Sequence, residues 1–186
     1  MLIRIVLFLL SLTGPAIASE ACDDLWLSRN QIMDRAGYCF ASPLGQALFD
    51  NTGCTAGQIR LSPADQQDIG KLRALEARIG CRVDTNRRWL NLTDLNFRLA
   101  LSSIPVLDEL PGACLAWTGP ETPLYAGHQK PFHAIGQIVP GDKIGFDHWP
   151  VGDWTYVTAH TPHGHAFKSA GWLYWPGRIP CSEMIP

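Results

Sequence analysis

The sequence has few charged residues and no cluster of basic ones. Asp, Glu, Lys and Arg together make up 17% of the 186 residues, and the formal net charge is −2. Proteins that bind nucleic acids or anionic membrane surfaces neutralise phosphates with clustered Lys and Arg. The composition therefore disfavours nucleic acid or an anionic membrane surface as the main partner.

Sequence signatures of a catalytic or metal centre are also missing. No C-x-x-C pair occurs, which disfavours a zinc knuckle or a thioredoxin-like redox site. No glycine-flanked nucleophilic serine and no pair of carboxylates near an expected cleft stands out. We expect a protein that is not an enzyme, with no metal and no cofactor.

Long apolar runs are scarce, and the clearest one lies at the start of the chain. Arg4 precedes an apolar run from Ile5 to Leu12, and the small-x-small triplet Ala16-Ile17-Ala18 follows. This order is typical of a signal peptide, and the run is too short to remain as a membrane span. We expect residues 1–18 to be removed near Ala18, which leaves a mature secreted or periplasmic protein without a membrane span.

Six cysteines are present, and an even number in an exported protein predicts a set of disulfides. The sequence alone does not choose among the possible pairings. We expect Cys54–Cys81, because these residues flank one predicted helix, and Cys114–Cys181, because they bracket the C-terminal strands. Cys22–Cys39 then follows by elimination.

Apolar residues at helical spacing predict helices before residue 112 and short strands after it. We expect helices to start at the caps Asp23, Ser42, Ser62 and Thr93 and to end at Gly37, Phe49, Gly80 and Ala100 or Leu101. Beyond the expected boundary at Leu110-Pro111-Gly112, we expect strands at 113–117, 124–125, 134–139, 143–146, 152–157 and 171–173. The fold class is therefore α+β, with a helical domain at 19–81, a connector with a short helix at 82–112 and an all-β domain at 113–186.

Residues 22–81 resemble the bacterial extracytoplasmic YARHG domain. The positions that match the pattern of that family are Asn30, Ile32, Arg35, Gly37, Tyr38 and Phe40. Met33, Asp34 and Ala36 stand where the family has tyrosine, alanine and histidine. The resemblance implies a cell-envelope location and no established activity.

Residues 123–174 are similar to bacterial SH3-like (SH3b) domains. The matching positions are Ile135, Gly136, Ile138, Gly141, Ile144, Gly152, Trp154, Tyr156, Val157, Gly171, Trp172 and Leu173. The resemblance implies a small all-β SH3-like barrel of the kind attached to cell-wall enzymes for targeting or recognition. It implies binding rather than catalysis.

Aromatic residues are abundant in this C-terminal part, more than a small barrel needs inside. The candidate ligand-binding residues are Trp149, Trp154, Trp172, Tyr174 and Trp175. Exposed aromatic rings can contact a sugar or a peptide, whereas packing against the helical domain is the alternative. We expect recognition of cell-wall material or an envelope protein. The alternatives are a structural or inhibitory partner of an envelope hydrolase and, less favoured, a cell-wall hydrolase.

A histidine-rich loop follows the predicted strand at 152–157. His160, His163 and His165 lie close together, with Pro162 and Gly164 between them. Imidazole nitrogens can bind zinc or copper, but no carboxylate or cysteine is nearby in the sequence. We therefore expect an exposed loop rather than a metal site, and the sequence does not decide the question.

Overall fold

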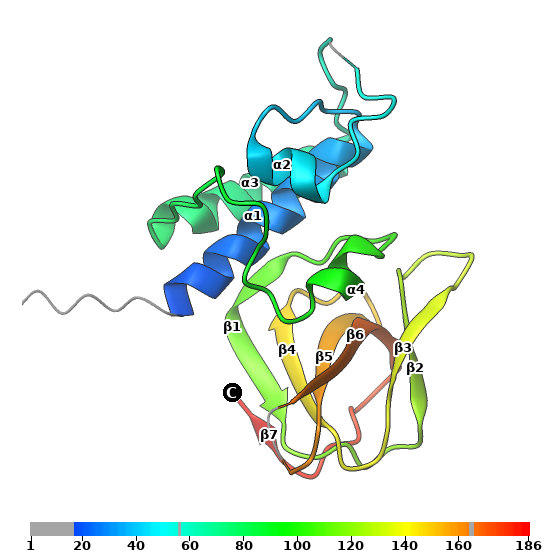
Figure 1. The fold of residues 1–186 in the computed structure, drawn as a ribbon. Helices are drawn as coiled ribbons and strands as arrows, with labels where there is room; N and C mark the ends of the chain where they lie inside the picture. The colour runs from blue at the N-terminus through cyan, green and yellow to red at the C-terminus, as the bar shows by residue number, and fades with distance from the viewer. Residues whose placement is uncertain (1–16, 56, 164–165) are drawn as a thin grey trace, which may run out of the picture.

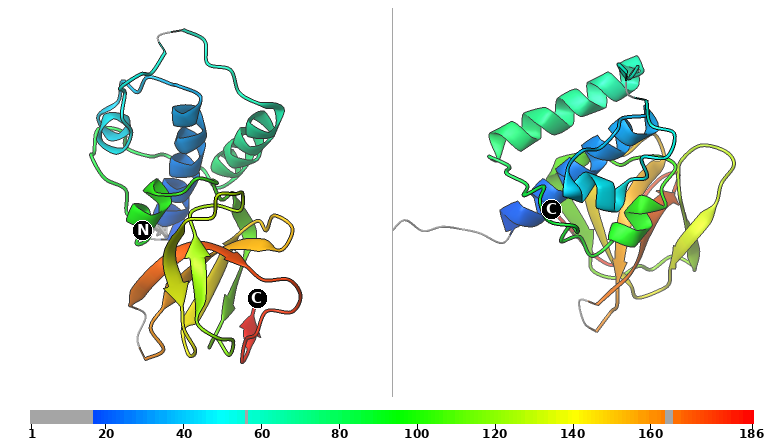
Figure 2. Two further views of the ribbon diagram at one scale, coloured as in Figure 1. Left: turned by 90° about the vertical axis from the view of Figure 1, so that its right-hand side faces the viewer. Right: turned by 45° about the horizontal axis from the view of Figure 1, so that its top comes forward.

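A computed structural model describes residues 17–55, 57–163 and 166–186. Four helices lie on one side of a single antiparallel sheet (Figures 1 and 2). The helices are α1 (Ile17–Arg35), α2 (Pro43–Leu48), α3 (Pro63–Arg78) and α4 (Leu95–Leu99). The strands are β1 (Leu107–Cys114), β2 (Thr122–Tyr125), β3 (Ala134–Ile138), β4 (Lys143–His148), β5 (Trp154–His160), β6 (Phe167–Tyr174) and β7 (Met184–Ile185). The predicted α+β class is confirmed.

Two helices begin where the sequence predicts. Ser42 caps α2, because its side chain accepts a hydrogen bond from the backbone N–H of Gly45. Ser62 and Asp65 form a reciprocal capping box at the start of α3, in which each side chain accepts from the backbone of the other residue. Proline at the first helical position strengthens both starts.

Two predicted caps are wrong. Helix α1 begins at Ile17, so Asp23 lies inside it, where it pairs with Arg87 and accepts from the backbone N–H of Asn91 at 2.8 Å. Helix α4 begins after Asp94 instead of Thr93 and ends at Leu99, before the predicted Ala100 or Leu101. At Asp23, contacts with a distant segment decide the role of the side chain.

Two of the three predicted disulfide pairs are wrong. The bonds are Cys22–Cys81, Cys39–Cys54 and Cys114–Cys181. The prediction is confirmed only for Cys114–Cys181. Cys22 and Cys39 cannot pair, because α1 separates them by roughly 20 Å along its axis. Cys22 instead meets Cys81 at the end of α3, which packs beside α1.

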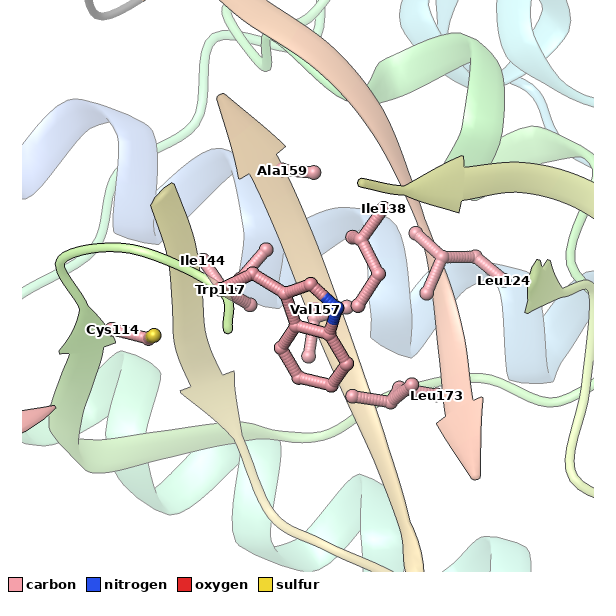
Figure 3. Close-up of a cluster of buried hydrophobic side chains, with 8 residues drawn as sticks. All are labelled: Cys114, Trp117, Leu124, Ile138, Ile144, Val157, Ala159 and Leu173. Carbon is pink, nitrogen blue, oxygen red and sulfur yellow. The ribbon is translucent and has the colours of Figure 1, made fainter. Parts of the chain in front are cut away.

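The strands form one sheet in the order β3-β2-β6-β5-β4-β1-β7. Eight buried residues pack together as one core, and Figure 3 shows them: Cys114, Trp117, Leu124, Ile138, Ile144, Val157, Ala159 and Leu173. Trp117 comes from the segment between β1 and β2, and the other seven come from β1 to β6. Because strands across the sheet contribute to it, the sheet has a core of its own. The predicted all-β character of the C-terminal region is confirmed.

The opposite side of the sheet faces the helices. Tyr156 and Trp172 are buried there with Leu101, and Phe97 of α4 packs against them. The segment Leu110-Pro111-Gly112, expected to be a boundary, lies inside β1 at a register shift between Leu107 and Gly112. The short strand β7 was not predicted.

The leader predicted at residues 1–18 lies outside the described residues up to Ala16, so its removal stays a prediction. In the part of the chain that the structure describes, the helices are too short or too polar for any of them to cross a membrane.

Candidate functional site

A cleft of about 700 Å³ lies between the helices and the sheet. Its apolar walls come from α3, β1 and the segments beside them. Its polar side chains come from α1, α3, the segment before α4, β1, β4 and β5. The polar residues that make this cleft a candidate site are Glu20, Asp24, Asp94, Asp147, His148 and His160. None of the carboxylates among them was singled out from the sequence.

A buried ion pair joins the helices to the sheet beside this cleft. Arg98 is fully buried, and its two terminal nitrogens contact the carboxylate of Asp24 at 2.7 and 3.0 Å. Nε2 of His148, at the end of β4, lies 3.0 Å from Oδ2 of Asp24 and 3.2 Å from Nη1 of Arg98. Burial alone would raise the pKa of Asp24, but Arg98 and His148 outweigh it and hold this pKa well below its usual range.

The buried polar contacts around Arg98 form a network that also includes a residue of β5. The hydroxyl of Tyr156 donates to Oδ2 of Asp94 at 2.8 Å, and the guanidinium carbon of Arg98 lies 5.4 Å from the centre of the Tyr156 ring. Burial and the negative charge of Asp94 raise the pKa of Tyr156 well above its usual value. The phenol therefore stays protonated and acts as a donor.

Two carboxyl groups of the cleft have environments that disfavour their charge. Partial burial raises the pKa of Glu20 on α1, although the residue as a whole is exposed, and the neighbouring Asp94 and Asp147 raise it further. Burial also raises the pKa of Asp147 on β4; Asp24 and Asp94 add to the rise, and His148 opposes it. The cleft thus gathers negative charge from both the helices and the sheet.

A cluster of aromatic rings forms a second candidate site, on the sheet. Trp154 is its centre: its ring centroid lies 5.1 Å from that of Phe132, 5.0 Å from Tyr174 and 5.8 Å from Tyr125. Phe132 is 45% exposed and Tyr174 is 46% exposed. We call Tyr125, Phe132, Trp154 and Tyr174 the aromatic cluster.

The five predicted ligand-binding residues do not share one surface. Trp154 and Tyr174 lie together in the aromatic cluster. Trp172 is buried, and its indole N–H donates to the carbonyl of Ser103 at 2.9 Å, so it belongs to the core.

The other two predicted residues lie apart from the aromatic cluster. Trp175 packs edge-on against Trp117 and donates to the carbonyl of Arg178 at 3.0 Å. Trp149 is half exposed and lines a small hollow beside α3.

The histidine loop is only partly described. His160 lines the cleft and His163 is exposed, whereas Gly164 and His165 lie outside the described residues. Within the residues that the structure describes, no three His, Cys, Asp or Glu side chains are grouped so that they could hold a metal ion.

The fold and its sites define an α+β protein in which a helical head with two disulfides packs on a disulfide-linked sheet. Residues 80–186 match the family described as "Domain of unknown function (DUF4453)", which covers more than half of the chain. The chain therefore belongs to the DUF4453 family. Residues 5–77 match the YARHG domain, which confirms the first resemblance. No curated protein and no solved structure matches the chain.

These matches bear on location. YARHG is an extracytoplasmic domain, and three disulfides are stable in such a compartment. The chain is accordingly an extracytoplasmic protein. The C-terminal match is to DUF4453, and the SH3-like resemblance remains a proposal.

Proposed function

We propose that this protein is a non-catalytic recognition protein of the cell envelope that binds cell-wall material through the aromatic cluster. One observation carries the proposal: four rings from β2, β5, β6 and the segment between β2 and β3 lie against one another, and two of them, Phe132 and Tyr174, are nearly half exposed. Aromatic rings offer large apolar faces, which suit the faces of sugar rings and apolar peptide groups.

Packing within the cluster favours binding, because its rings are already held in place. Trp154 contacts three other rings and is partly buried between them. A surface ordered in advance loses little conformational entropy when a ligand arrives, so more of the contact energy appears as affinity. Secretion or a periplasmic location, as the predicted signal peptide implies, would bring this surface to the wall.

We further propose that the sheet is SH3-like. Support comes from turn glycines at matching positions: Gly141 and Gly152 both have positive φ angles, just before β4 and β5. The non-catalytic character is supported by the cysteines, because all six are paired and leave no thiolate for a cysteine hydrolase.

The experiment is co-sedimentation of the oxidised mature protein with isolated cell-wall sacculi at low and physiological salt. The double substitution Phe132→Ala/Tyr174→Ala removes the two exposed rings of the cluster. We expect it to weaken binding roughly tenfold, since each ring contact contributes about 0.5–1.5 kcal/mol. Trp89→Ala, which removes an exposed ring outside the cluster, is the matched control and should bind like wild type.

Melting temperatures of all variants would show that the fold is retained. Wild-type protein that stays in the supernatant at both salt concentrations would contradict wall binding. It would favour the alternative of a structural or inhibitory partner of an envelope hydrolase. Equal binding by wild type and the double variant would show that the binding site lies outside the aromatic cluster.

A further inference from the structure

The cleft between the helices and the sheet brings carboxylates together across an interface. Glu20 and Asp24 belong to α1, Asp94 precedes α4, and Asp147 belongs to β4. Apolar side chains line the rest of the space, among them Leu75, Ile79, Leu92, Leu107 and Pro111. Charges that face each other across an apolar cleft are screened less than charges at an open surface.

Several of the acidic residues around the cleft have a cationic partner. Arg98 pairs with Asp24, Arg87 with Asp23, and Arg78 of α3 with Glu109 of β1 at the rim. Among the described residues, Glu20 and Asp147 form no ion pair with Lys or Arg. Glu20 therefore meets the carboxylates of Asp94 and Asp147 without a Lys or Arg partner of its own in the described part of the chain. Around Asp147, His148 and His160 partly offset the negative charge.

Other titratable groups line this space or lie beside it, and each element around it supplies some. Besides Glu20, Asp24 and Asp147, they are Arg78 on α3, Asp94 and Arg98 at α4, Asp108 and Glu109 on β1, His148 on β4, and Tyr156 and His160 on β5. His148 and His160 oppose the carboxylates at Asp147, because both act to lower its pKa. His148 also contacts both Asp24 and Arg98.

We propose that this cleft is an acid-responsive joint: protonation of Glu20 and Asp147 removes repulsion between α1 and β4 and tightens the packing of the helices on the sheet. Ionisation of the same two groups loosens this packing. The proposal concerns the interface and does not depend on wall binding by the aromatic cluster.

The direction of the effect follows from the pKa values. Burial raises the folded-state pKa of both Glu20 and Asp147 above the unfolded-state value of about 4. Each group therefore contributes stability that is fully present below that value and is lost as pH rises through the raised folded-state pKa. Asp24 has a lowered pKa, so its contribution is lost only below pH of about 4. Between about pH 4 and neutrality, the two raised groups favour the acidic condition, and Asp34, whose pKa burial also raises, acts in the same direction. His128, whose pKa burial lowers, acts in the opposite direction, so comparison with a variant that lacks both carboxylates isolates the contribution of Glu20 and Asp147.

The test compares thermal unfolding at about pH 5 and about pH 7.5, two conditions chosen around this window. Wild type should melt at a higher temperature under the acidic condition, by about 2–4 °C. The double substitution Glu20→Gln/Asp147→Asn should already be stabilised at neutral pH, and its difference between the two pH values should be less than half that of wild type. Asp153→Asn, at an exposed carboxyl before β5, is the control and should keep the wild-type difference.

Hydrogen-exchange protection factors give a readout that does not require the variants. In wild type, α1 and β4 should gain protection at the acidic pH relative to the far strands β2 and β3, which do not line the cleft. A lower wild-type melting temperature at acidic pH would overturn the proposal. So would a double variant that keeps the full pH difference.

Discussion

A single glycine decides how closely two neighbouring strands approach. Gly171 lies in β6 with a φ angle of +155°, opposite Val157 of β5. A Cβ atom at this position would lie 3.0 Å from both Cβ of Leu124 and the carbonyl oxygen of Tyr125 in β2. Such contacts are tighter than most Cβ contacts in proteins, so a neighbour would have to move, and here one of the neighbours is backbone. The close approach of β6 to β2 at Gly171 therefore requires a residue without a side chain.

Gly171→Ala should destabilise the protein by about 1–3 kcal/mol, the usual cost of overpacking a filled core. Urea unfolding would measure the change. Gly70→Ala is the matched control, because Gly70 lies inside α3 and a Cβ atom added there would meet no other atom within 4 Å. It should stabilise α3 by about 0.5–1 kcal/mol through helix propensity. Equal signs for the two substitutions would contradict this account.

Sequence pattern at the scale of residues predicts strands well but not how deeply each side chain on a face is buried. Trp154 and Trp172 both lie in predicted strands and on the same face of the sheet. Trp172 is buried, whereas Trp154 is only partly buried, in the aromatic cluster. Alternation shows that neighbouring side chains point to opposite faces. It does not show that α4 and the segment after it cover the face on which Trp172 lies.

At the scale of elements, the disulfides fix the helical head. Cys22–Cys81 joins the start of α1 to the end of α3 and closes a separation of 59 residues, whereas Cys39–Cys54 closes one of 15. In the chain-entropy model, the longer loop contributes about 4 kcal/mol and the shorter about 3 kcal/mol.

Removal of the longer bridge by Cys22→Ser/Cys81→Ser should accordingly lower the free energy of unfolding more than Cys39→Ser/Cys54→Ser does. Urea unfolding of the two double variants would give the order. The longer bridge also holds two packed helices together, so its loss should release α3 from α1. A larger loss for the Cys39/Cys54 variant would show that the short bridge stabilises the head more.

Local signals predicted the helices whose ends depend on neighbours in sequence. Ser42 and Ser62 cap α2 and α3 as predicted, since a cap requires only the next three residues. Asp23 carries the same type of signal but is not a cap. It instead binds Arg87 and Asn91, 64 and 68 residues away. Contacts over such separations cannot be read from a single sequence.

At the scale of the whole molecule, the cleft could not be predicted from the sequence, because the residues that meet beside it are far apart along the chain. Arg98 is 74 residues from Asp24, and His148 is 124 residues from Asp24. Only the packing of the helices on the sheet brings them together. The one sequence signal was Arg98 itself, a charged residue between Phe97 and Leu99 in a short helix.

The buried Asp24–Arg98 pair should couple the helical head to the sheet. Arg98→Met leaves the buried Asp24 charge without its main partner, which typically costs about 3–5 kcal/mol. The double variant Asp24→Asn/Arg98→Met removes both charges and should recover part of that loss. Arg78→Met, which breaks the exposed pair with Glu109, is the control and should cost less than about 1 kcal/mol.

Hydrogen exchange followed through denaturant would show the effect on cooperativity. In wild type, α1 and the central strands β5 and β6 should lose protection together, because Asp24, Arg98 and Tyr156 form one network between them. In Arg98→Met, α1 should open at a lower denaturant concentration than the strands. If α1 and the strands still opened together in this variant, the network would not be what joins the head to the sheet, and the apolar contacts of Leu101, Tyr156 and Trp172 would be the remaining link.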